Sequence, residues 1–293
     1  MKFAKMQGIG NDYVYVNCFE ETVDNPQSLA RMVSDRHFGI GSDGLILIRP
    51  SIQADFFMEM FNADGSRSAM CGNGIRCVGK YVYDHGLTDK TELAVNTLDG
   101  VKRLYLNVEG GRVASVTVDM GEPRLDPASV PVLSECNPVV AQPIEVAGSR
   151  FEMTCVSMGN PHAVVFVDDV EGFPVGEVGR LFEQHPAFPE RVNAEFVNVI
   201  NRSEVSMRVW ERGTGETLAC GTGACASTVA CVLNGLTDDG VTLHLLGGDL
   251  YVKWDRNLNR VFMTGPAATV FEGEIDVSSC PCDNPPHVVD SNW

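Results

Sequence analysis

The chain contains two copies of one pattern. Short motifs of the first half recur in the second half, each displaced by the same 149 residues. Self-similarity at one fixed offset indicates a duplicated structural unit, and it constrains the fold more than any local propensity does. The matched pairs are Gly10-Asn11 with Gly159-Asn160, Met58-Glu59-Met60-Phe61 with Met207-Arg208-Val209-Trp210, Cys71-Gly72-Asn73-Gly74 with Cys220-Gly221-Thr222-Gly223, and Gly86-Leu87-Thr88-Asp89 with Gly235-Leu236-Thr237-Asp238. We therefore predict two homologous lobes related by a pseudo-twofold axis.

Strands dominate each predicted lobe. Short β-branched and aromatic runs indicate strands at 14–16, 45–48, 56–60 and 113–118, and again at 163–167, 196–200, 205–210 and 261–264. One apolar helix per lobe is predicted directly after the Cys-Gly-x-Gly motif, at 75–85 and 224–234, with Gly86 or Gly235 in the C′ position. We predict an α+β fold in which a barrel-like, mostly antiparallel sheet surrounds the central helix of each lobe.

Prolines mark the boundary between the lobes, because five of them cluster between Gly121 and Phe151. We predict an N-terminal lobe over 1–125, which the C-terminal end rejoins at about 265–277, and a C-terminal lobe over 126–264. Residues 278–293, which contain Cys280-Pro281-Cys282, are predicted to be an irregular tail.

Composition excludes several classes of protein. The formal net charge of −17 opposes nucleic-acid binding, which needs a basic face. No run approaches the roughly 20 apolar residues of a membrane span, and the N-terminus lacks the apolar core of a signal peptide. The ten cysteines include no Cys-x-x-Cys, so a zinc ribbon or a thioredoxin-like motif has no local support. We expect a cytoplasmic protein with reduced thiols.

Each lobe places a thiol at the start of its helix. Cys71 and Cys220 stand directly before Gly-x-Gly. Free N–H groups and the helix dipole favour anions at that end. We therefore predict that the pKa of each thiol is lowered towards the thiolate, and that the glycine loops hold a carboxylate. A lone cysteine of this kind is usually a core residue, but the same motif at matched positions of a duplicated chain favours function.

A pseudo-twofold axis would bring both helix starts to one substrate carbon. One thiolate would remove its α-proton, and the opposite thiol would deliver a proton to the other face. Backbone N–H dipoles would stabilise the charge that develops on the substrate carboxylate. The pattern predicts a two-base epimerase without pyridoxal or metal. Cys77, Cys225 and Cys231 lie inside the predicted helices and are interpreted as core residues.

These motifs resemble those of the diaminopimelate epimerase family, and the resemblance covers the chain from Met1 to about Gly273. The resemblance lies in Gly8 to Asp12, Asp35 to Gly41, Phe61 to Ser66, Met70 to Cys77, Gly159 to His162, Glu211 to Gly213 and Leu218 to Gly223. It implies conversion of LL-2,6-diaminopimelate to the meso form, on the route to lysine and peptidoglycan. It also implies a cofactor-free homodimer.

The resemblance assigns roles to residues of this chain. Cys71 and Cys220 would carry the protons, and His162 and Glu211 would lie near them and influence their protonation. The substrate would be bound by Asn11, Asn62, Gly72, Asn73, Asn160, Asn193, Glu211, Arg212, Gly221 and Thr222. Some family members have Gln where this chain has Gly44, so no contact is expected there.

Three alternatives stay open. A proline or hydroxyproline racemase of the same architecture is disfavoured by Asn73, because those relatives usually carry His there. An isomerase of this fold that lacks one thiol is disfavoured by the presence of both Cys71 and Cys220. A thiol redox or metal-binding module is the alternative from another class, since this pair of cysteines could form a disulfide.

Overall fold

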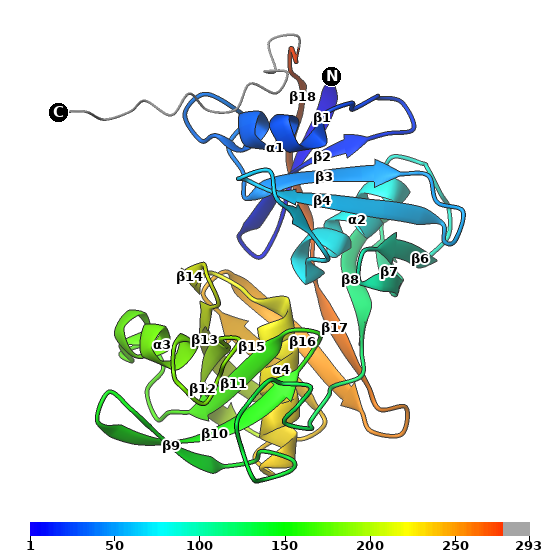
Figure 1. The fold of residues 1–293 in the computed structure, drawn as a ribbon. Coiled ribbons are helices and arrows are strands. Elements are labelled where there is room, and N and C mark those ends of the chain that lie inside the picture. Colours follow the sequence, from blue (N-terminus) through cyan, green and yellow to red (C-terminus); the bar gives the residue numbers. More distant parts are fainter. Residues whose placement is uncertain (278–293) are drawn as a thin grey trace, which may run out of the picture.

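The computed structural model describes residues 1–277, so the predicted tail with Cys280 and Cys282 lies outside the described residues. Two lobes of similar build lie one beside the other (Figure 1). The first half of the chain forms β1 (Lys2–Gly8), β2 (Asn11–Asn17), α1 (Pro26–Ser34), β3 (Gly44–Arg49), β4 (Phe56–Asn62), β5 (Arg67–Ser68), α2 (Gly72–Asp84), β6 (Glu92–Thr97), β7 (Gly100–Glu109) and β8 (Arg112–Gly121). The second half forms β9 (Gln142–Val146), β10 (Ser149–Ser157), β11 (Pro161–Phe166), α3 (Val175–Glu183), β12 (Asn193–Asn201), β13 (Glu204–Glu211), β14 (Gly215–Thr217), α4 (Gly221–Leu233), β15 (Gly240–Leu245), β16 (Gly248–Asp255), β17 (Arg260–Pro266) and β18 (Ala268–Glu274).

The duplication extends to whole elements. Helices α1 and α3 correspond at both ends at the same shift of 149 residues, and so do α2 and α4. The sequence pattern predicted only one helix per lobe, so α1 and α3 were not expected. Each has only nine residues, and such short helices are held by the burial of one face rather than by propensity. In α1 that face is formed by Leu29, Ala30 and Val33.

The predicted α+β fold with mostly antiparallel strands is confirmed. Neighbouring strands such as β1–β2, β3–β4 and β6–β7 pair antiparallel, whereas β2–β3 pairs in parallel across α1. The second lobe repeats this arrangement, with β11–β12 in parallel across α3. The lobes are joined where β8 pairs with β17, and β18 then returns to pair with β1.

The helices α2 and α4 lie at the centres of the lobes and are largely buried. The predicted core cysteines Cys77, Cys225 and Cys231 are fully buried. The predicted glycine ends are confirmed: Gly86 and Gly235 have φ of 72° and 70°, and the next residue of each donates its N–H back five positions. No helix among residues 1–277 is long and apolar enough to cross a membrane.

The predicted helix starts are wrong by three residues. Both helices begin at the first glycine of the motif, Gly72 or Gly221, rather than after the second. The reason is that each cysteine is itself the N-cap residue: Cys71 accepts the N–H of Gly74, and Cys220 accepts that of Gly223. The sulfur atoms are therefore fixed at the helix ends by the fold itself.

Candidate active site

The two helix starts meet between the lobes. A Cβ built on Gly221 would lie 3.7 Å from the Cα of Gly72. Met263 of β17 packs against both, because a Cβ on Gly72 would lie 2.9 Å from its Cε and one on Gly221 would lie 3.1 Å from its Sδ. Larger residues would force the helices apart, so the glycines allow the two cysteine-bearing turns to converge.

Cys71 occupies the first of these turns. Its Sγ accepts the Gly74 N–H at 3.3 Å and donates to Asn11 Oδ1 at 3.1 Å. Burial raises the pKa of the Cys71 thiol, although the N–H groups of Gly74 and Asn73 and the charge of Arg76 act in the opposite direction. The predicted lowering of this pKa is wrong, because the cost of burying a thiolate exceeds the contribution of the helix end.

Cys220 occupies the second turn and is only 6% exposed. Its Sγ accepts the Gly223 N–H at 3.3 Å and lies 3.5 Å from Thr222 Oγ1. Burial raises the pKa of Cys220 well above its usual value, and the negative charges of Glu211 and Glu195 raise it further. The predicted lowering is wrong here too. Burial therefore favours the neutral thiol form of both sulfurs.

Glu211 lies beside Cys220, where the sequence placed it. It ends β13, and its Oε1 accepts the hydroxyl of Thr217 at 2.5 Å. Burial raises the pKa of the Glu211 carboxyl. Arg212, the next residue, is exposed, and its Nη1 donates to the carbonyl oxygen of Glu190 at 3.0 Å. Its guanidinium is thus within reach of solvent at the edge of the site.

Asn193 and Asn73 use their amides inside the protein. Asn193 is buried, donates to the Pro161 carbonyl at 2.7 Å and accepts the backbone N–H of Arg212 at 2.9 Å. The Oδ1 of Asn73 accepts Arg76 Nη1 at 2.9 Å. Asn193 thereby supports the backbone of Arg212. The roles of Asn193 and Asn73 as substrate ligands stay predictions.

The other predicted asparagines end or begin strands around the site. Asn62, at the end of β4, donates to Ser66 Oγ at 3.0 Å. Asn160, directly before β11, donates to Thr222 Oγ1 at 3.2 Å. Their roles as substrate ligands stay predictions.

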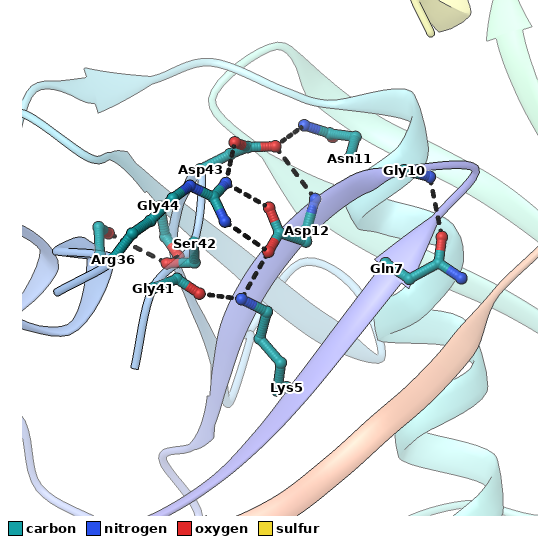
Figure 2. A network of polar contacts seen from close by, with 11 residues as sticks. Lys5, Gln7, Gly10, Asn11, Asp12, Arg36, Gly41, Ser42, Asp43 and Gly44 are labelled. Carbon is teal, nitrogen blue, oxygen red and sulfur yellow. Dashed lines mark hydrogen bonds and ion pairs between the residues drawn. The ribbon is translucent and has the colours of Figure 1, made fainter. Parts of the chain in front are cut away.

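Asn11 begins β2 and is held by a charged network (Figure 2). Its Nδ2 donates to Asp43 Oδ2 at 2.8 Å, which turns its Oδ1 towards Cys71. Arg36 bridges Asp43 and Asp12 at 3.0 Å to each, and Lys5 pairs with Asp12 at 2.5 Å. The network fixes the Asn11 amide, so its two ends are not interchangeable.

Three buried or partly buried charged residues, Glu195, Arg76 and Asp43, were not predicted from the sequence to have a role at the site. Glu195 is fully buried and its Oε1 lies 2.7 Å from His162 Nδ1. Arg76 is fully buried, and it donates to the carbonyl oxygens of Gly72 and Pro266 at 3.1 Å each. Asp43 holds Asn11. A signal existed for the first two, because a charged residue in an otherwise buried strand or apolar helix is rare unless it is paired.

Solved structures of other proteins have the fold of this chain. Its fold matches that of a probable proline racemase from Agrobacterium radiobacter K84, with a TM-score of 0.68, 15% identity and coverage of 95% of this chain and 94% of that one. It matches a phenazine biosynthesis protein of the PhzF family from Bacillus anthracis equally well, with a TM-score of 0.68, 15% identity and coverage of 94% and 98%. The chain therefore shares its mixed α+β fold with these two proteins.

Sequence comparison narrows the class to one family. The sequence model of the family described as diaminopimelate epimerase matches residues 3–125 and 154–270. A diaminopimelate epimerase of Acetivibrio thermocellus is 60% identical over 278 residues, which cover 95% of this chain and 99% of that protein. One from Agathobacter rectalis is 59% identical, with coverage of 94% and 100%. The chain belongs to the diaminopimelate epimerase family, and the resemblance seen in its motifs is confirmed.

Proposed function

We propose that this chain is an isomerase that converts LL-2,6-diaminopimelate to the meso form, on the route to lysine and peptidoglycan, by α-proton transfer between Cys71 and Cys220. Relatives of about 60% identity carry this activity in their names. The observation that carries the two-base mechanism is the convergence of the two cysteine-capped helices, because a Cβ built on Gly221 would lie only 3.7 Å from the Cα of Gly72.

The proposed step needs one thiolate and one thiol. The thiolate takes the proton from the substrate α-carbon, and the bonding electrons pass into the adjacent carboxylate group. The opposite S–H then gives its proton to the other face of the carbon. The centre is inverted, and the two sulfurs have exchanged protonation states. No cofactor or metal takes part in the proposed step.

The developing negative charge needs preorganised donors. The first-turn N–H groups of a helix have no acceptor within the helix. Those of Gly72-Asn73 and Gly221-Thr222 lie at the two ends that meet, so one carboxylate can receive bonds from both lobes. Removal of a single donor aimed at the developing charge typically raises the activation barrier by about 3–4 kcal/mol.

The far end of the substrate carries a second carboxylate and a second ammonium. Arg212 suits the carboxylate, because a guanidinium binds it in a bidentate manner. The carboxylate of Glu211 and the amide oxygens of Asn11, Asn62 and Asn160 suit the ammonium groups. His162 acts on the thiols only indirectly in this proposal, since both ring nitrogens contact other residues.

The test is epimerisation of LL-2,6-diaminopimelate in deuterated water. We expect α-deuterium chiefly in the meso product during early turnover, with little label in unreacted substrate, because separate thiols serve the two faces. Cys71→Ala and Cys220→Ala should each abolish epimerisation, whereas Cys231→Ala, a buried cysteine of the same helix α4, should not. Rapid labelling of unreacted substrate, or activity in either of the first two variants, would contradict the mechanism.

We further propose a cytoplasmic homodimer with lobes at 1–125 plus 265–277 and at 126–264. The pairing of β18 with β1 supports the assignment of the C-terminal segment to the first lobe. Sedimentation equilibrium would measure the oligomeric state, and a monomer at micromolar concentration would contradict the dimer.

A further inference from the structure

The second lobe contains a buried ionisable pair that the first lobe lacks. His162 and Glu195 are both 0% exposed, and His162 Nδ1 lies 2.7 Å from Glu195 Oε1. At the matching positions, 149 residues earlier, the first lobe has Tyr13 and Ile46. An apolar side chain therefore suffices to pack this place in the fold, so the packing of the lobe does not by itself explain a buried carboxylate at position 195.

A chain of hydrogen bonds runs from Glu195 to Cys220. Beyond Glu195, His162 Nε2 lies 2.9 Å from Asn160 Oδ1, and Asn160 Nδ2 donates to Thr222 Oγ1 at 3.2 Å. Thr222 Oγ1 in turn lies 3.5 Å from the sulfur of Cys220. Glu195 also packs against the Cys220 turn, because a Cβ on Gly223 would lie 2.7 Å from its Oε1.

The hydrogen bonds between Glu195 and Cys220 have one consistent direction of donation. Asn160 donates to Thr222, so its carbonyl oxygen faces His162, and Nε2 of the imidazole must carry a proton. The hydroxyl of Thr222 accepts from Asn160, which leaves its own proton free to point at Cys220. A donor at that sulfur stabilises the thiolate that forms when Cys220 gives up its proton.

Glu195 completes the order at the far end. Its Oε1 faces Nδ1 at 2.7 Å, so one proton is shared between them. Among the described residues, its Oε2 is buried and has no hydrogen-bond partner. A carboxyl that keeps one oxygen unpaired in the interior is costly, and this indicates a role beyond packing. The other titratable groups that interact with it electrostatically are Cys155, Glu211 and Cys220.

We propose that Glu195 is a positioning residue: through His162 it fixes the Asn160 amide, and thereby directs the Thr222 hydroxyl towards the Cys220 sulfur. The inference rests on the proposed function of Cys220. A positioning role does not require the negative charge of Glu195. A neutral side chain of the same length that donates a hydrogen bond, such as glutamine, can hold the Nδ1 of His162 equally well.

The test compares three variants of one position. Glu195→Met and Glu195→Ile, the second copying Ile46 of the first lobe, remove the partner of Nδ1. We expect kcat to fall about tenfold or more, since misplacement of a reacting group by about 1 Å can cost 100-fold. Glu195→Gln donates to Nδ1 and should keep kcat within threefold of the parent. Cys155→Ala, a buried change beside Glu195, is the matched control and should leave kcat unchanged.

Two readouts separate positioning from stability. In the background of Thr222→Val, Glu195→Met should cause little further loss, because both changes break the same chain. In substrate-free protein, nitrogen-15 NMR should show a protonated Nε2 of His162 in the parent and in Glu195→Gln, and an exchange-broadened signal in Glu195→Met. Additive losses, equal damage by Gln and Met, or an unprotonated Nε2 in the parent would overturn the inference. The NMR result does not depend on which substrate the enzyme uses, so it is informative even if diaminopimelate is not turned over.

Discussion

Gly223 offers a sharp test of how closely the site is packed. It lies in the first turn of α4, where a Cβ would meet Glu195 Oε1 at 2.7 Å and Cys220 Sγ at 3.2 Å. Ordinary contacts begin at 3.4 Å, so Gly223→Ala requires Glu195 to move by about 0.7 Å, and Cys220 by less. Both of these side chains belong to the hydrogen-bond chain that ends at the sulfur.

The expected cost in stability is small and the expected cost in activity is large. Overpacking costs about 1–3 kcal/mol, and alanine recovers roughly 0.8–1.0 kcal/mol over glycine within a helix. The net loss is therefore about 0–2 kcal/mol, which lowers Tm by a few degrees at roughly 2–4 °C per kcal/mol. A displacement of several tenths of an ångström at the reacting sulfur should reduce kcat about tenfold to hundredfold.

Gly74→Ala is the matched variant in the first lobe. A Cβ there would meet the Ile46 Cδ1 at 2.7 Å, which is the movable end of an apolar side chain. We expect a smaller loss of kcat than for Gly223→Ala, with a similar change in stability. Chiral chromatography of the meso product measures kcat, and urea unfolding measures stability. Equal losses of kcat in the two variants, or parental activity in Gly223→Ala, would refute this reasoning.

Two further predictions concern stability. In α3, the Cβ of Gly176→Ala would meet nothing within 4 Å, and this variant should raise stability by about 0.5–1 kcal/mol. Gly179→Ala would place its Cβ 2.4 Å from the Trp210 Cβ and should lower stability by about 1–3 kcal/mol. Thermal unfolding would show Tm shifts of opposite sign for the two variants. Burial raises the pKa of Cys155, Cys225 and Cys231 to about 12 and that of Cys77 to about 11, from the usual 9.0. As pH rises, the unfolded chain loses these thiol protons before the folded protein does. The contribution of the buried thiols to stability is therefore present below pH 9 and is lost as pH rises towards 11–12. A Tm that stayed constant from pH 8 to pH 11 would contradict this prediction.

The sequence predicted what depends on the repeat. Once Cys71 and Cys220 were matched, the pairing of the lobes, the two central helices and their glycine ends followed, because these features depend on local chemistry that both copies share. The outer helices were missed although a local signal was present: Asn25 caps α1, and Pro26 occupies its first turn. Nine residues with one buried face give little periodicity to distinguish them from a loop.

Sequence alone could not predict what depends on burial. The helix end at Cys71 suggested a lowered pKa, but the sign was decided by the depth of the sulfur, which is a property of the packed lobes. The contacts of Asn193 with the Pro161 carbonyl and of Asn73 with Arg76 could not be predicted either. No motif contains that information, because the partner of each amide is distant in the chain or fixed by helix geometry.

The two lobes share a backbone but differ in the side chains around it. At the proposed reacting centre the donors are backbone N–H groups. A duplication preserves these whatever the side chains are, which suits a carbon that must be approached from both faces. Beyond the thiols the substrate has only one far end. Away from the thiols, the two lobes need not carry the same side chains, and the residues at matched positions differ: Asn62 corresponds to Glu211, Tyr13 to His162 and Ile46 to Glu195. The divergence also makes the two sulfurs electrostatically unequal, since Glu211 acts on both, whereas Glu195 acts on Cys220 and Arg76 on Cys71. A two-base enzyme can use such inequality, because it makes one of the two sulfurs easier to deprotonate than the other.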